Sequence, residues 1–430
     1  MMSRVVFTLM LGLIAAPQQT PAPPTQTQTQ TPAQCLADVR AYVTKRTAEL
    51  RPLTSETATK LTAERTEMTK ACAAKFDVKT VAEKDLSGLA DIYSDLNQPD
   101  LANAAVTRAL ASKTLAETDR ATLLAQSIRL MMRELKSDER NARIEKVVDQ
   151  LDTMSPAVLE QKIGAHLSMN GYYRGDDIDA GIVKHSTWLI ATGKTLSPEL
   201  RKKYGPQIVS AYVNMAEAWA GQGMNDDAIA LLKRAPAEWA DVPNVSERVR
   251  STLDRYLLVG TPGAAITAPR FLNAPAATTR VDMKGQVTLL EFTAHWCGPC
   301  KESYPGINRL RARFESQGFR VVLATQLYGY FQTERNLDAA AEIDRDRSYF
   351  AEHHLNVPVA VADRVTASVK DGVVVYSPAP EPNETAYKVG GIPQIQLIDR
   401  QGRIRLIMVG YDDANEAGLA KFIEKLLKEK

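Results

Sequence analysis

The stretch VTLLEFTAHWCGPCK, residues 287–301, runs from an apolar segment directly into a pair of cysteines. Residues 287–292 are rich in Val and Leu, which is typical of a strand in a sheet that is covered on both faces. Apolar residues then recur at Ile307 and Leu310 with the spacing of an amphipathic helix. The sequence therefore predicts a buried strand that leads into a helix, with Cys297 at the start of that helix.

Cys297 and Cys300 are separated only by Gly298 and Pro299. The first turn of a helix has unpaired backbone N–H groups and the positive end of the helix dipole, so the thiolate of Cys297 is favoured there. Pro299 is tolerated because its missing N–H would have no helical partner. Two sulfurs one turn apart can form and break a disulfide. The motif predicts a redox-active pair that needs no metal or organic cofactor.

A structural zinc site is the alternative for the same pair. Such a site needs a second pair of ligands in the same domain. His353 and His354 are neighbours on a predicted helix and point in different directions, and the other two cysteines lie far upstream. We therefore expect no bound metal.

A second motif, VGGIPQIQLID, occupies residues 389–399. Together with TAHWCGPCK it resembles the thioredoxin superfamily. The resemblance implies that Pro393 follows a cis peptide bond and faces the active disulfide, and that the backbone of Ile392 pairs with substrate as a β-strand would. It also implies that Trp296, Gly298 and Pro299 contact the substrate. An ordinary trans proline at the start of a strand is the alternative for Pro393.

Glu291 lies six residues before Cys297 in a segment that is otherwise apolar. A buried carboxylate is costly unless it has a partner or a task. Thioredoxins have an acidic residue, more often aspartate, at the matching position, where it relays the proton of the inner cysteine. The resemblance implies this catalytic role for Glu291 toward Cys300. The alternative is a partly exposed or salt-bridged glutamate.

Length and charge limit the possible functions. A chain of 430 residues is expected to form more than one domain. Its 53 basic and 51 acidic residues give a formal net charge of +2, which does not favour nucleic acid as a partner. The four cysteines are too few to staple a small scaffold and indicate individual functions.

The N-terminus has the pattern of an exported protein. Residues 1–16 place Arg4 before an apolar run that is too short to span a bilayer, as in a secretory signal peptide. An uncleaved signal anchor is the alternative. Residues 17–34 contain only Pro, Gln, Thr and Ala and predict a disordered linker. We expect export to the periplasm or cell envelope.

Residues 35–258 have a helical pattern almost throughout. Large residues such as Tyr93 precede small ones such as Ala102, and the spacing within residues 86–109 recurs within residues 212–235. These stretches resemble tetratricopeptide helix hairpins. We predict an all-α solenoid that binds a peptide or protein partner on its concave face, with a bare packing scaffold as the alternative.

Cys35 and Cys72 stand equally far from a predicted turn at residues 52–55. An antiparallel hairpin of the two flanking helices would place the two cysteines side by side. We predict a structural disulfide, formed in an oxidising compartment. Two unpaired cysteines that behave as small apolar residues are the alternative.

The sequence GTPG at residues 260–263 ends the helical pattern and marks a domain boundary. Residues 265–430 resemble TlpA-type thioredoxins, which are exported thiol-disulfide oxidoreductases, and we predict an α/β thioredoxin-like fold for them. The resemblance implies protein substrates with disulfides and a membrane electron donor. The Gly-Pro pair between the cysteines favours reduction, and His295 is expected to raise the reduction potential somewhat.

A protein of a different class fits the same pattern. The helical repeats could serve an adaptor or assembly factor, in which the thioredoxin-like domain only docks partners. Loss of insulin reduction when Cys297 is replaced by Ser would favour the enzyme over the adaptor.

Overall fold

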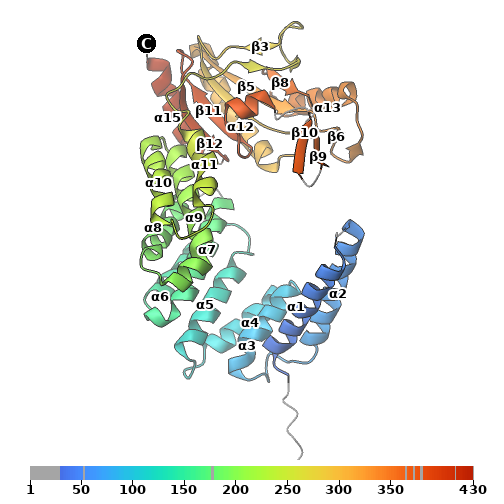
Figure 1. Cartoon of the computed structure of the whole chain (residues 1–430), viewed down its shortest axis with the longest axis vertical. Coiled ribbons are helices and arrows are strands. Elements are labelled where there is room, and N and C mark those ends of the chain that lie inside the picture. Colours follow the sequence, from blue (N-terminus) through green and yellow to red (C-terminus); the bar gives the residue numbers. More distant parts are fainter. Residues whose placement is uncertain are drawn as a thin grey trace, which may run out of the picture. The chain divides into compact units, whose positions relative to one another are not determined.

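The computed structural model describes residues 30–51, 54–175, 179–363, 366–370, 373–377, 381–411 and 413–429. The chain divides into two compact units, one ending at Leu130 and one beginning at Met131 (Figure 1). The predicted signal peptide lies outside the described residues, as does most of the predicted linker. None of the described helices is both long and apolar enough to cross a membrane.

The first unit is built from helix hairpins. Its helices are α1 (Pro32–Glu49), α2 (Ser55–Ala73), α3 (Leu86–Asp95), α4 (Pro99–Leu110) and α5 (Glu117–Met131). α1 begins inside the predicted linker because Thr31 and Gln34 cap it: the Thr31 hydroxyl accepts from the Gln34 backbone N–H at 3.2 Å, and the Gln34 side chain accepts from the Thr31 N–H at 2.9 Å. Ala102 and Ala109 of α4 are fully buried, which lets α4 pack closely on α3.

The second unit begins with six more helices. They are α6 (Asp138–Asp152), α7 (Leu159–Gly175), α8 (Asp179–Gly193), α9 (Pro198–Gly221), α10 (Asn225–Glu238) and α11 (Val245–Tyr256), and each packs on the next from α6 to α11. The recurring spacing corresponds to the pairs α3/α4 and α9/α10. Their identity as tetratricopeptide repeats stays a prediction.

A mixed sheet follows the helices, with strand order β12-β11-β4-β5-β8-β2. The strands are β2 (Arg270–Leu272), β4 (Val287–Phe292), β5 (Phe319–Gln326), β8 (Val359–Ala362), β11 (Gln394–Ile398) and β12 (Ile404–Val409). β4, β5 and β8 run parallel, while β11 is antiparallel to both β4 and β12, and β2 is antiparallel to β8. The central strand β4 is therefore the apolar segment that leads into the cysteine pair.

Four helices and several short strands complete this part of the fold. The helices are α12 (Gly298–Phe314), α13 (Ala339–Glu352), α14 (Pro382–Ala386) and α15 (Asp413–Lys428). The short antiparallel pairs are β1 (Ile266–Thr267) with β3 (Arg280–Val281), β6 (Tyr330–Phe331) with β7 (Glu334–Arg335), and β9 (Thr366–Lys370) with β10 (Val373–Ser377).

The two faces of the sheet belong to two different cores. Val287 and Leu289 of β4 lie in the core formed with α12, α13 and α15. Leu290 and Phe292 lie in a second core, which also contains buried residues of α9, α10 and α11. Because side chains alternate along a strand, Glu291 points to the same face as Leu289, toward α12. Three of the helices, α9, α10 and α11, thus cover one face of the sheet directly, rather than packing only on other helices.

Candidate active site

The cysteine pair lies at the N-terminus of α12. Cys297 is the N-cap residue with an extended backbone, and its sulfur accepts the backbone N–H of Cys300 at 3.2 Å. The two sulfurs form a disulfide with an S–S distance of 2.05 Å. Pro299 occupies the first turn, where a helix needs no N–H donor. The positive end of the helix therefore lies at the sulfur of Cys297, which favours its thiolate once the pair is reduced.

Exposure differs sharply around the disulfide. Cys297 exposes 3% of its surface and Cys300 none, while Trp296 exposes 49%. Gly298 and Pro299 are also exposed. A partner chain would therefore meet these three exposed residues first, and of the two cysteines only Cys297 has any exposed surface.

Glu291 is completely buried beneath the helix. The Ser303 hydroxyl lies 3.1 and 3.3 Å from its two carboxyl oxygens and 2.7 Å from the carbonyl oxygen of Cys300. A hydroxyl donates only one proton. The Ser303 hydroxyl can therefore donate to the Glu291 carboxyl group or to the Cys300 carbonyl, but not to both at once. Donation from Ser303 lowers the pKa of Glu291, but the larger effect of burial raises that pKa to about 8.

Ser303 is a site residue that the sequence analysis did not identify. It lies three residues after Cys300, on the buried side of α12 together with Tyr304 and Ile307. The sequence contained one signal for Ser303, which is a small polar residue on the apolar stripe of a helix. A hydroxyl buried there needs a hydrogen-bond partner.

The ring of His295 packs among three aromatic rings. Its ring centroid is 5.5 Å from that of Tyr328, 5.3 Å from Tyr330 and 4.9 Å from Phe331. Burial, and then the charge of Lys301, lower the pKa of His295 to about 4. The neutral ring adds no positive charge that would stabilise the thiolate, so it gives no electrostatic reason for a raised reduction potential.

The Ile392–Pro393 peptide bond is cis. β11 begins at the next residue, Gln394, which pairs with Phe292 at the end of β4. We call the turn at the cis Ile392–Pro393 bond the proline bend. The register brings the proline bend alongside the segment that leads into the cysteines. The carbonyl oxygen of Pro393 accepts the Gly410 N–H at 2.9 Å, and the Gln394 side chain donates to the Tyr387 carbonyl at 3.0 Å. Both bonds hold the bend from the side of the sheet.

Arg255 of α11 holds the same segment from the helical side. This arginine is buried, with 4% of its surface exposed. It donates to the carbonyl oxygen of Lys388 at 3.1 Å and pairs with Glu217 of α9 at 3.1 Å. Gly390 follows two residues later, against the guanidinium. The helices before the sheet thus contribute directly to the backbone that leads into Pro393.

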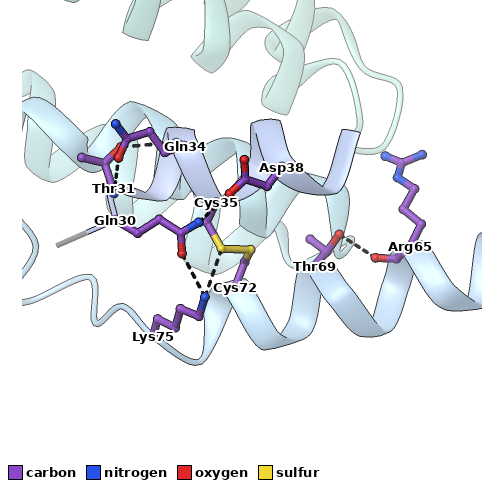
Figure 2. The surroundings of a disulfide bond; sticks show 9 residues. All are labelled: Gln30, Thr31, Gln34, Cys35, Asp38, Arg65, Thr69, Cys72 and Lys75. Carbon is purple, nitrogen blue, oxygen red and sulfur yellow. Dashed lines mark hydrogen bonds between the residues drawn. A yellow bond between two sulfur atoms is a disulfide. The ribbon is translucent and has the colours of Figure 1, made fainter. Parts of the chain in front are cut away.

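The second disulfide joins Cys35 of α1 to Cys72 of α2, with an S–S distance of 1.97 Å and a Cα–Cα distance of 5.9 Å (Figure 2). Both cysteines are buried. The Lys75 ammonium lies 3.7 Å from the Cys35 sulfur and donates to the Gln30 side chain at 3.0 Å (Figure 2). This bond clamps the first helix hairpin.

The described residues contain no group of three or more His, Cys, Asp or Glu side chains arranged to hold a metal ion. His353 is the C-cap residue of α13 and packs on the rings of Tyr304 and Tyr349, and His354 follows it.

Comparisons with known proteins found similarity over part of the chain. No protein-family model matches the chain. Over 145 residues the chain is 23% identical to the thiol-disulfide oxidoreductase ResA of Bacillus cereus, and the match covers 34% of this chain and 66% of that relative. The chain thus spans slightly less than two thirds of the length of this curated relative.

Solved structures with similar parts include a protein from Chlorobium tepidum described as thiol:disulfide interchange protein DsbE. It has 27% identity and a TM-score of 0.28, and the match covers 39% of this chain and 97% of that one. StoA from Bacillus subtilis has 17% identity and a TM-score of 0.26, with 37% and 97% covered.

Proposed function

We propose that this chain, whose C-terminal domain belongs to the thioredoxin superfamily, is a thiol-disulfide oxidoreductase that reduces disulfides in protein substrates. One observation carries the proposal: Cys297 and Cys300 form a disulfide at the N-terminus of α12, above a buried carboxyl group. The match to a thiol-disulfide oxidoreductase favours this chemistry over a docking role.

The reaction begins with the reduced pair. The thiolate of Cys297 attacks one sulfur of the substrate disulfide, whose S–S bond breaks and releases the other sulfur as a thiolate. Cys300 then attacks the Cys297 sulfur of the mixed disulfide and releases the second substrate sulfur. Two electrons pass to the substrate, and the enzyme is left with the Cys297–Cys300 disulfide, the state that the structure describes.

Cys300 must lose its proton before it can attack, and Glu291 is the proposed acceptor. The ordinary pKa of a cysteine thiol, about 8.5, is close to the value of about 8 to which burial raises the pKa of Glu291, so a proton transfer between two such groups costs little free energy. Ser303 lies between the carboxyl group and the backbone of Cys300 and fixes the orientation of Glu291.

Several further properties belong to the same proposal. The cysteine pair serves as the only redox group, with no metal or organic cofactor. The Gly-Pro pair and the neutral His295 favour reduction over oxidation. The protein acts outside the cytoplasm, in the periplasm or envelope, and a membrane electron donor restores its dithiol. The helices before residue 258 bind a protein partner as a tetratricopeptide-like solenoid.

Insulin reduction by the full-length chain tests the central claim. With dithiothreitol as electron source, the wild-type chain is expected to accelerate precipitation of the insulin B chain, and Cys297→Ser is expected to abolish the acceleration. Cys35→Ser is the matched control, because it removes a disulfide outside the site. Equal rates with and without Cys297 would rule out the proposed enzyme.

A further inference from the structure

A cavity of about 430 Å³ opens beside the segment that leads to Ile392 and Pro393. One wall is α11, and the other is α14 with the segment that continues to Gly390. Its lining residues are Glu247, Arg250, Ser251, Asp254, Glu384, Thr385, Lys388, Val389 and Gly390. We call this cavity the α11 pocket. Its second wall is the same stretch of chain that runs into Ile392 and Pro393, so the pocket adjoins the place where a substrate strand would pair.

The α11 pocket is lined by charge. Glu247, Arg250 and Asp254 lie three, four and seven residues apart, which puts them on one face of α11. Glu384 and Lys388 face them from the opposite wall. Within the part of the chain that the structure describes, none of these five side chains forms an ion pair. The pocket therefore presents charges that are free to bind a ligand.

Glu384 is the member that gains most from a partner. Arg250 and Lys388 are exposed, so water solvates their charges at little cost. Glu384 is half-buried and lies near a second carboxyl, Glu381. Burial, and then the charge of Glu381, raise the pKa of Glu384. A cation from outside would relieve both the lost hydration and the repulsion.

The position of Glu384 also connects the pocket to the disulfide. Burial, and then the charge of Glu384, raise the pKa of the Tyr328 hydroxyl, so Glu384 lies near enough to Tyr328 to act on it electrostatically. The ring of Tyr328 meets the exposed ring of Trp296 edge-on, with centroids 5.5 Å apart. Trp296 precedes Cys297. A chain bound at the disulfide can thus continue over Tyr328 to Glu384.

We propose that the α11 pocket is a subsite for the protein substrate and binds a lysine or arginine side chain near the reacting disulfide, with Glu384 as its main acceptor. The inference rests on the proposed reductase function and adds a substrate preference to it. The helices before the sheet then take part in substrate selection, because α11 supplies half of the subsite.

The test uses two sets of disulfide-bonded peptides that differ only in lysine or glutamine, stepped through the positions that flank one cysteine. At the favoured position, the wild-type chain is expected to have a lower KM for the lysine peptide. Glu384→Gln should raise that KM about threefold to tenfold, the range of one typical net hydrogen bond, and leave the glutamine peptide unchanged. Asp254→Asn, on the other wall, should act in the same direction.

Glu302→Gln is the matched control, since Glu302 is an exposed carboxylate of α12 that does not line the pocket. Equal KM values for lysine and glutamine at every position, or an equal rise in Glu302→Gln, would overturn the inference.

A second measurement separates the inference from the reductase itself. Fluorescence polarisation of the same peptides with serine in place of cysteine reports binding without chemistry. Tighter binding of the lysine peptide, lost in Glu384→Gln, would support the subsite even if no peptide were reduced, whereas reduction without any charge preference would remove the subsite and leave the reductase.

Discussion

The guanidinium of Arg255 fills the space in which a side chain at position 390 would stand. Gly390 is therefore required by a residue from a helix that lies far earlier in the chain. The same arginine donates to the carbonyl oxygen of Lys388 and pairs with Glu217. Gly390, the Lys388 carbonyl and Glu217 thus all contact the buried guanidinium of Arg255. The position of the segment that leads to Pro393 depends on these three contacts.

Arg255→Met should loosen this segment. The change removes the hydrogen bond to the Lys388 carbonyl and leaves Glu217 with fewer partners, so urea unfolding is expected to show a loss of about 2 kcal/mol. The KM for a protein substrate should rise, while the reaction of the dithiol with a small aromatic disulfide stays unchanged. Lys233→Met is the control, because Lys233 is exposed on α10, does not line the α11 pocket and should change stability by less than about 0.5 kcal/mol. A similar effect of both variants would contradict the role of Arg255 in holding the segment that leads to Pro393.

Gly390→Ala tests the same contact from the other side. A methyl group at this position would overlap the Arg255 guanidinium, which must move or push the backbone away. The KM for protein substrates is expected to rise as in Arg255→Met. Combining the two substitutions should cost less than the sum of the single changes, because both remove one interaction. Full additivity in a double-mutant cycle would show that the two residues act independently.

Glu291→Gln should slow resolution of the mixed disulfide. The lifetime of this intermediate, measured by acid quenching and mass spectrometry, is expected to fall with rising pH up to about 8 in the wild-type chain, as Glu291 becomes ionised. The variant has no such base and should lose this part of the pH dependence. The same pH profile in both proteins would exclude Glu291 as the proton acceptor.

Glu291 also links stability to pH. Its pKa is about 8 in the folded protein and lies near the ordinary glutamate value in the unfolded chain, so the folded state holds the proton more tightly. The associated stability is fully present below the unfolded pKa and is lost as pH rises toward about 8, by at most about 1.4 kcal/mol per pH unit. Urea unfolding of the oxidised protein at pH 5 and pH 8 should show this loss, and Glu291→Gln should reduce it. An equal change in both proteins would assign the loss to other groups.

Ser303→Ala should raise the pKa of Glu291 further above its ordinary value. The hydrogen bond from Ser303 lowers the pKa of Glu291 against the larger effect of burial, so its removal is expected to raise that pKa. The pH profile of resolution should then shift to higher pH with little change in the attack by Cys297. Ser303→Thr keeps the hydroxyl and should retain the wild-type profile. A slower reaction with no shift in pH would point to a packing role alone.

Replacing both Cys35 and Cys72 by Ser should destabilise the first unit and spare the chemistry. The disulfide closes a loop with a sequence separation of 37, for which chain entropy predicts about 4 kcal/mol. Thermal unfolding is expected to show a lower transition, while insulin reduction continues. Replacing both Cys297 and Cys300 by Ser should abolish insulin reduction and leave the unfolding transition nearly unchanged, because their disulfide closes only a short loop. Unchanged unfolding without the first disulfide would remove its structural role.

The sequence by itself determined the parts of the site that depend on neighbours along the chain. An apolar strand followed by two cysteines three positions apart specifies a disulfide at the start of a helix, because helical geometry fixes their distance. Alternation along β4 likewise puts Glu291 on one face, and equal distances from a turn bring Cys35 beside Cys72. These relations are local periodicities, which a single sequence contains.

Only the tertiary structure decided which elements meet. The pattern of α11 shows an amphipathic helix, but not that Arg255 reaches a carbonyl 133 residues away. The apolar face of the sheet could have been covered by any helix, and the structure covers it with α9, α10 and α11. Ser303 became a site residue only when β4 packed against α12. Burial and pairing between distant segments arise from how the surfaces fit together, and periodicity along the chain does not specify the partner.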